Sequence, residues 1–183
     1  YPKVSGAWVV HEEPFWSLDW VDQFRLRGAW GAAGQQPSTF DAARLYNPTV
    51  GHDDQPAIQP AAFGNPALKP ERGEELELGF DASFLGGRLS MEYTRFDRTV
   101  KDAIVNRPLP PSSGFSGSQI VNIGRVEAWG HELALNLRAV ESDGFAWDLD
   151  TQIATMGNEI VDLGGTDFIG AGGQAQHREG YSI

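Results

Sequence analysis

The stretch Glu71-Arg-Gly-Glu-Glu-Leu-Glu-Leu-Gly-Phe-Asp-Ala-Ser-Phe-Leu-Gly-Gly-Arg-Leu-Ser-Met-Glu-Tyr-Thr-Arg-Phe-Asp97 decides the fold. Apolar and polar residues alternate on both sides of Gly86-Gly87, which predicts a β-hairpin closed by a two-residue link. With Leu85 and Arg88 as partners beside the turn, one face is apolar and the other is polar. The apolar pairs are Phe84 with Leu89, Ala82 with Met91 and Phe80 with Tyr93; the polar pairs are Ser83 with Ser90, Asp81 with Glu92 and Glu75 with Arg98. A one-residue slip would mix the two faces, so the pattern specifies the register.

The hairpin admits two interpretations. An apolar face of about nine to ten residues per strand, opposite a polar one, is typical of transmembrane β-strands with one side toward lipid and the other toward a lumen. A half-buried hairpin of a soluble sheet shows the same alternation. The rest of the chain has to decide between them.

Composition excludes several classes of protein. The 183 residues carry a net charge of −11, the wrong sign for a protein that binds a phosphate backbone, so we expect no nucleic-acid partner. The chain has no Cys, which excludes disulfides and thiolate metal sites. No apolar run reaches the length of a transmembrane helix. With 22 Gly and 11% aromatic residues, we expect an all-β chain with long loops.

The expected strands alternate between short and long connections. Strands are predicted at 3–10, 23–31, on both sides of the Gly-Gly link, at 119–140 with a bulge or bend at Gly124 and Gly130, and at 145–156. The shorter links are 10–22, 85–88 and 141–144; the long irregular segments are 32–70, 98–118 and the part after 157. Loops this long are unusual inside a compact soluble domain. Short turns at one end and long loops at the other are the arrangement of outer-membrane barrels.

Aromatic residues are expected near the strand ends, as in the interfacial girdles of such barrels. They are Trp8, Trp30, Tyr93, Phe96, Trp129 and Trp147. Together with the alternating loop lengths, they favour a segment of a membrane barrel over a soluble sandwich.

Four blocks of sequence resemble one family. Gly64-Asn65-Pro66-Ala67-Leu68-Lys69-Pro70-Glu71, followed by Glu74-Glu75-Leu76-Glu77-Leu78-Gly79, resembles the "N-P-x-L-K-x-E" segment and "E-x-G" strand of TonB-dependent outer-membrane receptors, above all the SusC/RagA-like branch. The other blocks are Tyr1-Pro2-Lys3-Val4-Ser5 with Trp8 and Glu13-Pro14-Phe15, Leu26-Arg27-Gly28-Ala29-Trp30-Gly31 with Gly34-Gln35, and Asn122-Ile123-Gly124-Arg125-Val126 with Gly130-His131-Glu132-Leu133. They span roughly residues 1–137 in the family's order.

The resemblance implies a fold, a location and partners. Such receptors have a TonB box, a plug domain and a barrel of about 22 strands in the bacterial outer membrane. We therefore expect residues 1–183 to be an interior piece of the barrel's C-terminal half, without the plug, TonB box or closing strands, since nothing after Met156 reads as a strand pair. The family imports nutrients such as oligosaccharides, peptides or chelated metals. The implied partners are the TonB complex, a SusD-like surface lipoprotein, outer-membrane lipid and a glycan or peptide substrate.

Catalytic, cofactor and metal sites are not expected. His11-Glu12-Glu13 and His52-Asp53-Asp54 have metal-ligand types without the spacing of HExxH or EF-hand motifs. The 170–175 stretch matches G-x-G-x-x-A but lacks a βαβ frame, and 113–117 falls short of a nucleophile elbow.

Two further sets of residues invite functional interpretations. The carboxylates predicted on the polar face are Glu75, Glu77, Asp81, Glu92, Asp148 and Asp150. Two of them could form an acid/base pair, but a barrel lumen is polar in any case, and Asp81 beside Glu92 would be tolerated in a water-filled lumen or against an arginine of the plug. The aromatic loop residues Phe40, Tyr46, Phe63 and Phe115 could stack on sugar rings or pack the loops.

Transport through an outer-membrane barrel is the favoured function. The alternatives are a soluble β-sandwich that binds carbohydrate and, with the least support, an enzyme that uses carboxylates.

Overall fold

The computed structural model describes residues 2–113, 117–165, 168–172 and 175–183. The chain forms two compact units, each built from three separate segments. The first unit contains residues 1–33, 74–98 and 128–157, and the second contains residues 34–73, 99–127 and 158–183. No helix in the described residues is long and apolar enough to cross a membrane.

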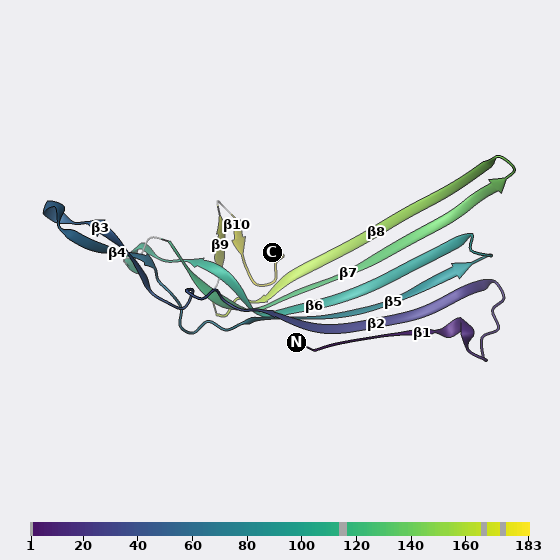
Figure 1. The fold of residues 1–183 in the computed structure, drawn as a ribbon, viewed down its shortest axis with the longest axis horizontal. Helices are drawn as coiled ribbons and strands as arrows, with labels where there is room; N and C mark the ends of the chain where they lie inside the picture. Colours follow the sequence, from purple (N-terminus) through teal and green to yellow (C-terminus); the bar gives the residue numbers. More distant parts are fainter. Residues whose placement is uncertain (1, 114–116, 166–167, 173–174) are drawn as a thin grey trace. The chain divides into compact units, whose positions relative to one another are not determined.

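Six long strands form one sheet in the order β1-β2-β5-β6-β7-β8 (Figure 1). Their bounds are β1 Lys3–Val9, β2 Val21–Gln35, β5 Glu71–Phe84, β6 Leu89–Pro108, β7 Ser118–Ser142 and β8 Phe145–Asp162. β1 and β2 are antiparallel, with Lys3 opposite Gly31 and Val9 opposite Arg25. Strands that follow one another in the sequence are neighbours in the sheet, apart from the insertion between β2 and β5. This is the up-and-down topology that the alternating strands predicted.

The central hairpin has the predicted register. The rings of Phe80 and Tyr93 lie 5.5 Å apart between centroids, and Arg98 Nε lies 3.9 Å from Glu75 Oε2. The turn itself is wider than the two-residue link we expected. Leu85, Gly86 and Gly87 all have positive φ, so four residues, 85–88, lie outside the strands. Gly87 N–H donates to Asp22 Oδ2, and Leu85 N–H donates to Trp20 O, which ties this turn to the start of β2.

The strands are longer than the sequence predicted, and the segments expected to be irregular contain strands of their own. β3 (Leu45–Val50) and β4 (Pro56–Ala62) form a two-stranded hairpin inside 32–70, with Pro48 opposite Ile58. β6 continues to Pro108, and so covers residues 98–108 of the segment expected to be irregular from 98 to 118. After Met156, β8 continues to Asp162, and β9 (Ile169–Gly172) pairs with β10 (Ala175–His177). The expectation that no strand pair follows Met156 was therefore wrong.

The short connections all belong to the first unit. The link from β1 to β2 begins with a 3-10 helix, Val10–Glu12, and the links from β5 to β6 and from β7 to β8 are turns at 85–88 and 143–144. The 3-10 helices of the long connections, His52–Asp54 and Pro111–Ser113, belong to the second unit. The alternation of connection lengths is thus present in the fold.

One face of the sheet in the first unit is apolar and uncovered. Leu78 and Ile153 are each 53% exposed, and Trp147 is 56% exposed, although all three are large apolar side chains on long strands. An aromatic row crosses this face from the β1–β2 link to β7: Trp16, Phe24, Phe80, Tyr93 and His131 follow at centroid separations of 5.7, 5.8, 5.5 and 6.0 Å. Tyr93 Oη and His131 Nδ1 are 2.7 Å apart.

Two details differ from the predicted girdle. Tyr93 and Trp129 lie well inside β6 and β7. For Tyr93 the reason is that β6 extends far beyond its predicted end, whereas β7 has almost its predicted bounds. Phe96 comes three residues after Tyr93 on β6, so its side chain points to the opposite face of the sheet. Its ring occupies the space in front of Gly130. Gly124 and Gly130 make room for neighbouring side chains within the continuous strand β7, at the points where we expected a bulge or bend.

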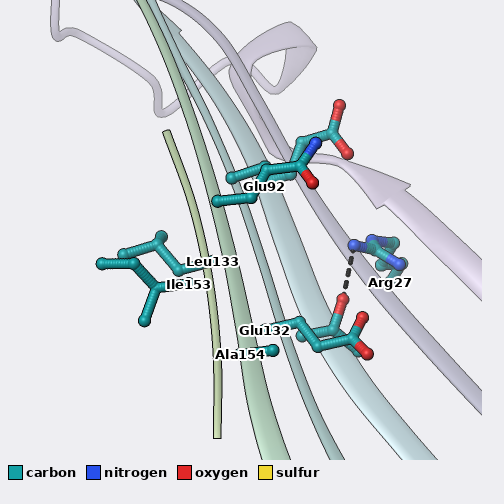
Figure 2. Close-up of a pocket in the computed structure, with 9 residues that line it drawn as sticks. Arg27, Glu92, Glu132, Leu133, Ile153 and Ala154 are labelled. Carbon is teal, nitrogen blue, oxygen red and sulfur yellow. Dashed lines mark hydrogen bonds between the residues drawn. The ribbon is translucent and has the colours of Figure 1, made fainter. Parts of the chain in front are cut away.

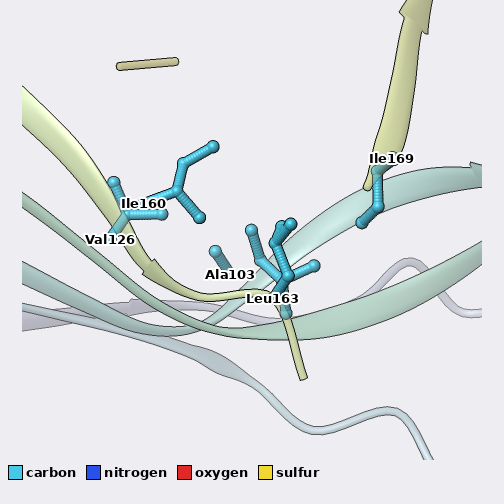
Figure 3. Packing of buried hydrophobic residues seen from close by; sticks show 6 residues of the cluster. Ala103, Val126, Ile160, Leu163 and Ile169 are labelled. Atoms are coloured by element: carbon cyan, nitrogen blue, oxygen red, sulfur yellow. The ribbon is translucent and has the colours of Figure 1, made fainter. Parts of the chain in front are cut away.

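The second unit contains a conventional hydrophobic core. Ile160 and Leu163 are the largest fully buried side chains, and they pack with Ala103, Val126 and Ile169, as Figure 3 shows. The residues come from β6, β7, β8 and β9 and from the residue after β8. This unit therefore has a core that is buried by residues of the same chain, whereas the first unit exposes large apolar side chains on one face of its sheet.

Gly130→Ala should weaken the first unit. A methyl group at this position would meet the Phe96 ring and Thr155 O, and overpacking of this kind costs about 1–3 kcal/mol. In the complete protein that carries this segment, the folded fraction should fall, as measured by heat-modifiable migration on gels. Gly6→Ala is the matched control, because nothing lies within 4 Å of the added methyl group. Equal losses in the two variants would contradict the packing argument.

Candidate substrate-facing wall

The polar face of the first unit gathers charged side chains from five strands. Figure 2 shows Arg27, Glu92 and Glu132 on one side of the strands, with Leu133 and Ile153 on the other. The separation follows from the strand geometry, because successive side chains point to opposite faces. The residues on this side are candidates for contact with water and solutes.

Asp81 of β5 is held by two arginines of β2. Arg25 Nε lies 2.8 Å and its Nη2 2.6 Å from Asp81 Oδ2, while Arg27 Nε lies 3.1 Å from Oδ1. Arg27 Nη2 also donates to Thr94 Oγ1 on β6 at 2.7 Å. The carboxylate therefore receives donors on both oxygens, and Arg27 links three neighbouring strands.

Further polar contacts join the remaining neighbours in the sheet. Arg98 of β6 lies 3.9 Å from Glu75 of β5. Asn136 Nδ2 of β7 donates to Ser90 Oγ of β6 at 3.3 Å. Arg138 Nε of β7 donates to Asp148 Oδ1 of β8 at 2.9 Å. Each pair of neighbours from β2 to β8 thus has at least one side-chain contact on the polar face.

Open grooves run between these contacts. One, of about 540 Å³, is lined by Arg27, Glu92, Glu132 and Gln152 among others. A second groove, of about 380 Å³, is lined by Asp81, Ser83, Ser90 and Glu92 among others. The predicted register requires these four residues to share one face. Glu92 and Glu132 have no ion-pair partner within the described part of the chain. Their carboxylates can accept hydrogen bonds from hydroxyl, amide or ammonium groups.

The predicted carboxylates are distributed along the wall. Asp81, Glu75 and Asp148 each contact an arginine, Glu77 lines a groove with Arg25 and Arg27, and Asp150 lines a groove with Asp148. The cations beside Asp81 come from β2 of the same sheet, whereas the sequence indicated only a water-filled lumen or an arginine of the plug. Arg25 and Arg27 were missed as its partners because residues 36–70 separate β2 from β5, so the register between these strands could not be derived from a turn.

The candidate metal ligands have other surroundings. His11 Nδ1 accepts a hydrogen bond from Phe24 N–H at 3.2 Å, which anchors the β1–β2 link. His52 and Asp53 are 3.3 Å apart at the highly exposed tip of the β3–β4 hairpin. Among the described residues, no group of three or more His, Asp or Glu side chains could hold a metal ion.

The other sequence candidates lie in the second unit. Ser113 Oγ donates to Pro110 O at the end of a 3-10 helix. Phe40 and Tyr46 are exposed, and Phe63 lies under the guanidinium of Arg44 at 5.0 Å. Phe115 and the central part of the 170–175 motif lie outside the described residues.

A family model described as TonB dependent receptor-like, beta-barrel, matches residues 2–174. The chain belongs to this family. Its six-stranded sheet is therefore a segment of the family's β-barrel, with β1 and β8 at the two edges of the described sheet.

Relatives of this TonB-dependent receptor segment agree with the assignment. The chain is 30% identical to TonB-dependent receptor P26 of Formosa agariphila over 92% of its length, and 29% identical to TonB-dependent receptor SusC of Bacteroides thetaiotaomicron over 91%. It spans 18% of each of these proteins. A solved structure of the RagAB peptide importer in its closed-closed state has the same fold over 98% of this chain and 20% of its own, with a TM-score of 0.86 at 22% identity.

Arg27→Ala should destabilise the receptor barrel more than Arg25→Ala. Arg27 bridges Asp81 and Thr94, whereas the Arg25 guanidinium bonds to Asp81 alone among the described residues and its side chain is 54% exposed. Net losses of about 1–2 kcal/mol for Arg27→Ala and under about 1 kcal/mol for Arg25→Ala follow from the number and exposure of the bonds. Urea unfolding of the full-length receptor in lipid vesicles measures both, and the reverse ranking would refute the bridging role.

Proposed function

We propose that this chain supplies part of the wall and the extracellular loops of an outer-membrane transporter that imports oligosaccharides or peptides. The observation that carries the proposal is the two-faced sheet of a TonB-dependent receptor barrel, with an uncovered apolar face and an opposite face of linked charges. In the proposed arrangement, lipid covers the first face and water fills the lumen along the second.

The substrate class is inferred from the wall and the relatives together. Polar grooves lined by Glu92, Glu132 and Gln152 suit an oligomer with many hydrogen-bonding groups. SusC is one relative, and the RagAB structures are described as a peptide importer or transporter. We infer that the complete receptor is energised through TonB and works with a SusD-like surface lipoprotein. The wall residues bind and guide, and no catalytic step is assigned to them.

A soluble carbohydrate-binding sandwich is the weaker alternative. Such a domain covers its apolar sheet face with a second sheet. Here Leu78, Trp147 and Ile153 remain about half exposed on the first unit's apolar face, in a unit built from a single sheet.

Ile153→Arg should block barrel assembly, whereas Gln152→Arg should be tolerated. The two residues are neighbours on β8, so their side chains point to opposite faces of the strand, with Gln152 on the side of the polar groove and Ile153 on the apolar side. An arginine on the lipid face near the bilayer midplane costs about 2–4 kcal/mol, while one at position 152 faces Glu92 and Glu132. Heat-modifiable migration of the full-length receptor from outer-membrane fractions reports assembly. Equal tolerance of the two arginines would refute the lipid-facing assignment.

Uptake by cells separates the two substrate classes. A strain that lacks other importers and carries the full-length receptor should take up labelled oligosaccharides or labelled peptides only while the proton gradient is intact. Uptake of one class and not the other identifies the substrate. Uptake of neither class, with the barrel assembled, would refute nutrient import of these classes.

A further inference from the structure

Strand β6 has an irregular site in the second unit at Asp102. This residue has φ of +53°, a left-handed conformation that interrupts regular strand geometry and is uncommon for residues other than glycine. Two side chains from neighbouring strands bond to the backbone at this site. Asn122 Nδ2 of β7 donates to Asp102 O at 2.7 Å, and Ile104 N–H donates to Glu71 Oε2 of β5 at 3.0 Å.

Asn122 bonds to Lys69 as well. Its Nδ2 donates to Lys69 O at 2.9 Å, and its Oδ1 accepts from Lys69 N–H at 2.8 Å. The side-chain amide thus satisfies both polar backbone groups of Lys69, as the peptide of a neighbouring strand would. With the bond to Asp102, both donors of the amide and its oxygen are in use.

The segment just before Lys69 is fixed in a similar way. Asn65 Nδ2 donates to Ile120 O at 3.0 Å, and Gln119 Nε2 donates to Gly64 O at 2.8 Å. Gly64 has φ of +65°, and a methyl group there would collide with the backbone of Ala43. Asn65 N–H also donates to Asp41 O, so the two ends of the inserted segment meet at this point.

We propose that Asn65, Glu71 and Asn122 form a clamp that positions residues 36–70, the arm, against β6 and β7. They are positioning residues: in the complete receptor they would hold the arm, with its exposed Phe40 and Tyr46, in a fixed place at the extracellular mouth. This role rests on the proposed import function, whereas the clamp itself rests on the hydrogen bonds. Two of the sequence blocks that carry the family resemblance, 64–71 and 122–126, accordingly supply the residues of this clamp.

A long connection held only at its ends would sample many conformations. The clamp adds side-chain bonds along the last residues of the connection, from Gly64 to Glu71, where β5 begins. Loss of Asn122 would leave the backbone groups of Lys69 and the carbonyl of Asp102 without these partners. The arm should then detach locally, while the strands of the first unit retain their contacts.

Trypsin cleavage after Arg44 reports detachment of the arm. In wild-type full-length receptor, assembled in outer-membrane vesicles, cleavage should be slow. Asn122→Ala removes three hydrogen bonds, and we expect the initial cleavage rate to rise about tenfold or more. Heat-modifiable migration should remain that of the wild type, and the substrate concentration for half-maximal uptake should rise.

Matched variants separate positioning from a general effect on folding. Asn136→Ala lies on the same strand and loses one 3.3 Å bond to Ser90 in the first unit, so the arm should stay protected. Glu71→Gln retains an acceptor for Ile104 N–H and should behave as wild type, whereas Glu71→Ala should raise the rate of cleavage after Arg44. Because Glu71 and Asn122 support the same irregular site, the double alanine variant should show non-additive cleavage rates.

Three results would overturn the clamp. The first two are cleavage of Asn122→Ala at the wild-type rate and equally fast cleavage of Asn136→Ala. The third is an Asn122→Ala variant that loses barrel assembly while its arm stays protected from trypsin. The import function fails separately. A wild-type receptor that takes up neither substrate class, but still shows the difference in cleavage between Asn122→Ala and Asn136→Ala, would refute import and leave the clamp supported.

Discussion

The two-residue period of side-chain direction is the constraint on which the rest of the first unit depends. Each strand from β2 to β8 must place its apolar residues on one face and its charged residues on the other, because neighbouring strands share both faces. The Arg25–Asp81–Arg27 contacts and the aromatic row through Phe80 and Tyr93 arise from this one geometric rule, on opposite sides of the same sheet. A shift of any strand by one residue would place arginines among leucines and destroy both sets of contacts.

The two units differ in what covers their apolar side chains. In the second unit Ile160 and Leu163 are buried by residues of the same chain, as in a soluble protein. In the first unit no comparable layer covers the apolar face, so its burial requires something outside the described chain. A family β-barrel explains the difference, because the hydrocarbon of a membrane covers such a face.

The sequence predicted contacts across the β5–β6 hairpin, where the Gly-Gly turn fixed the register. Phe80 with Tyr93 and Glu75 with Arg98 were both derived from the position of the Gly-Gly turn, and both are present even though that turn is wider than expected. It did not predict the partners of Asp81, because no short turn connects β2 to β5. The β3–β4 hairpin was not predicted from the sequence either, because prolines such as Pro48 argue against a central strand. Both strands of a two-stranded hairpin are edge strands, and an edge strand can contain proline.

The clamp shows why motif blocks can be recognised in a sequence before their role is understood. Gly64 and Asn65 look like loop residues by composition and Asn122 lies in a predicted strand, and nothing in their spacing indicates that residues over fifty positions apart bond to each other. Their bonds go to backbone atoms, so the partner residues' identities, such as Lys69 and Ile120, carry no signal of the contact. Side-chain amides are suited to this task, because one group can donate and accept where an interrupted strand leaves both kinds of backbone group without a regular partner. The wall therefore depends on the pattern of polarity, which many sequences can satisfy, whereas the arm depends on particular residues at particular positions.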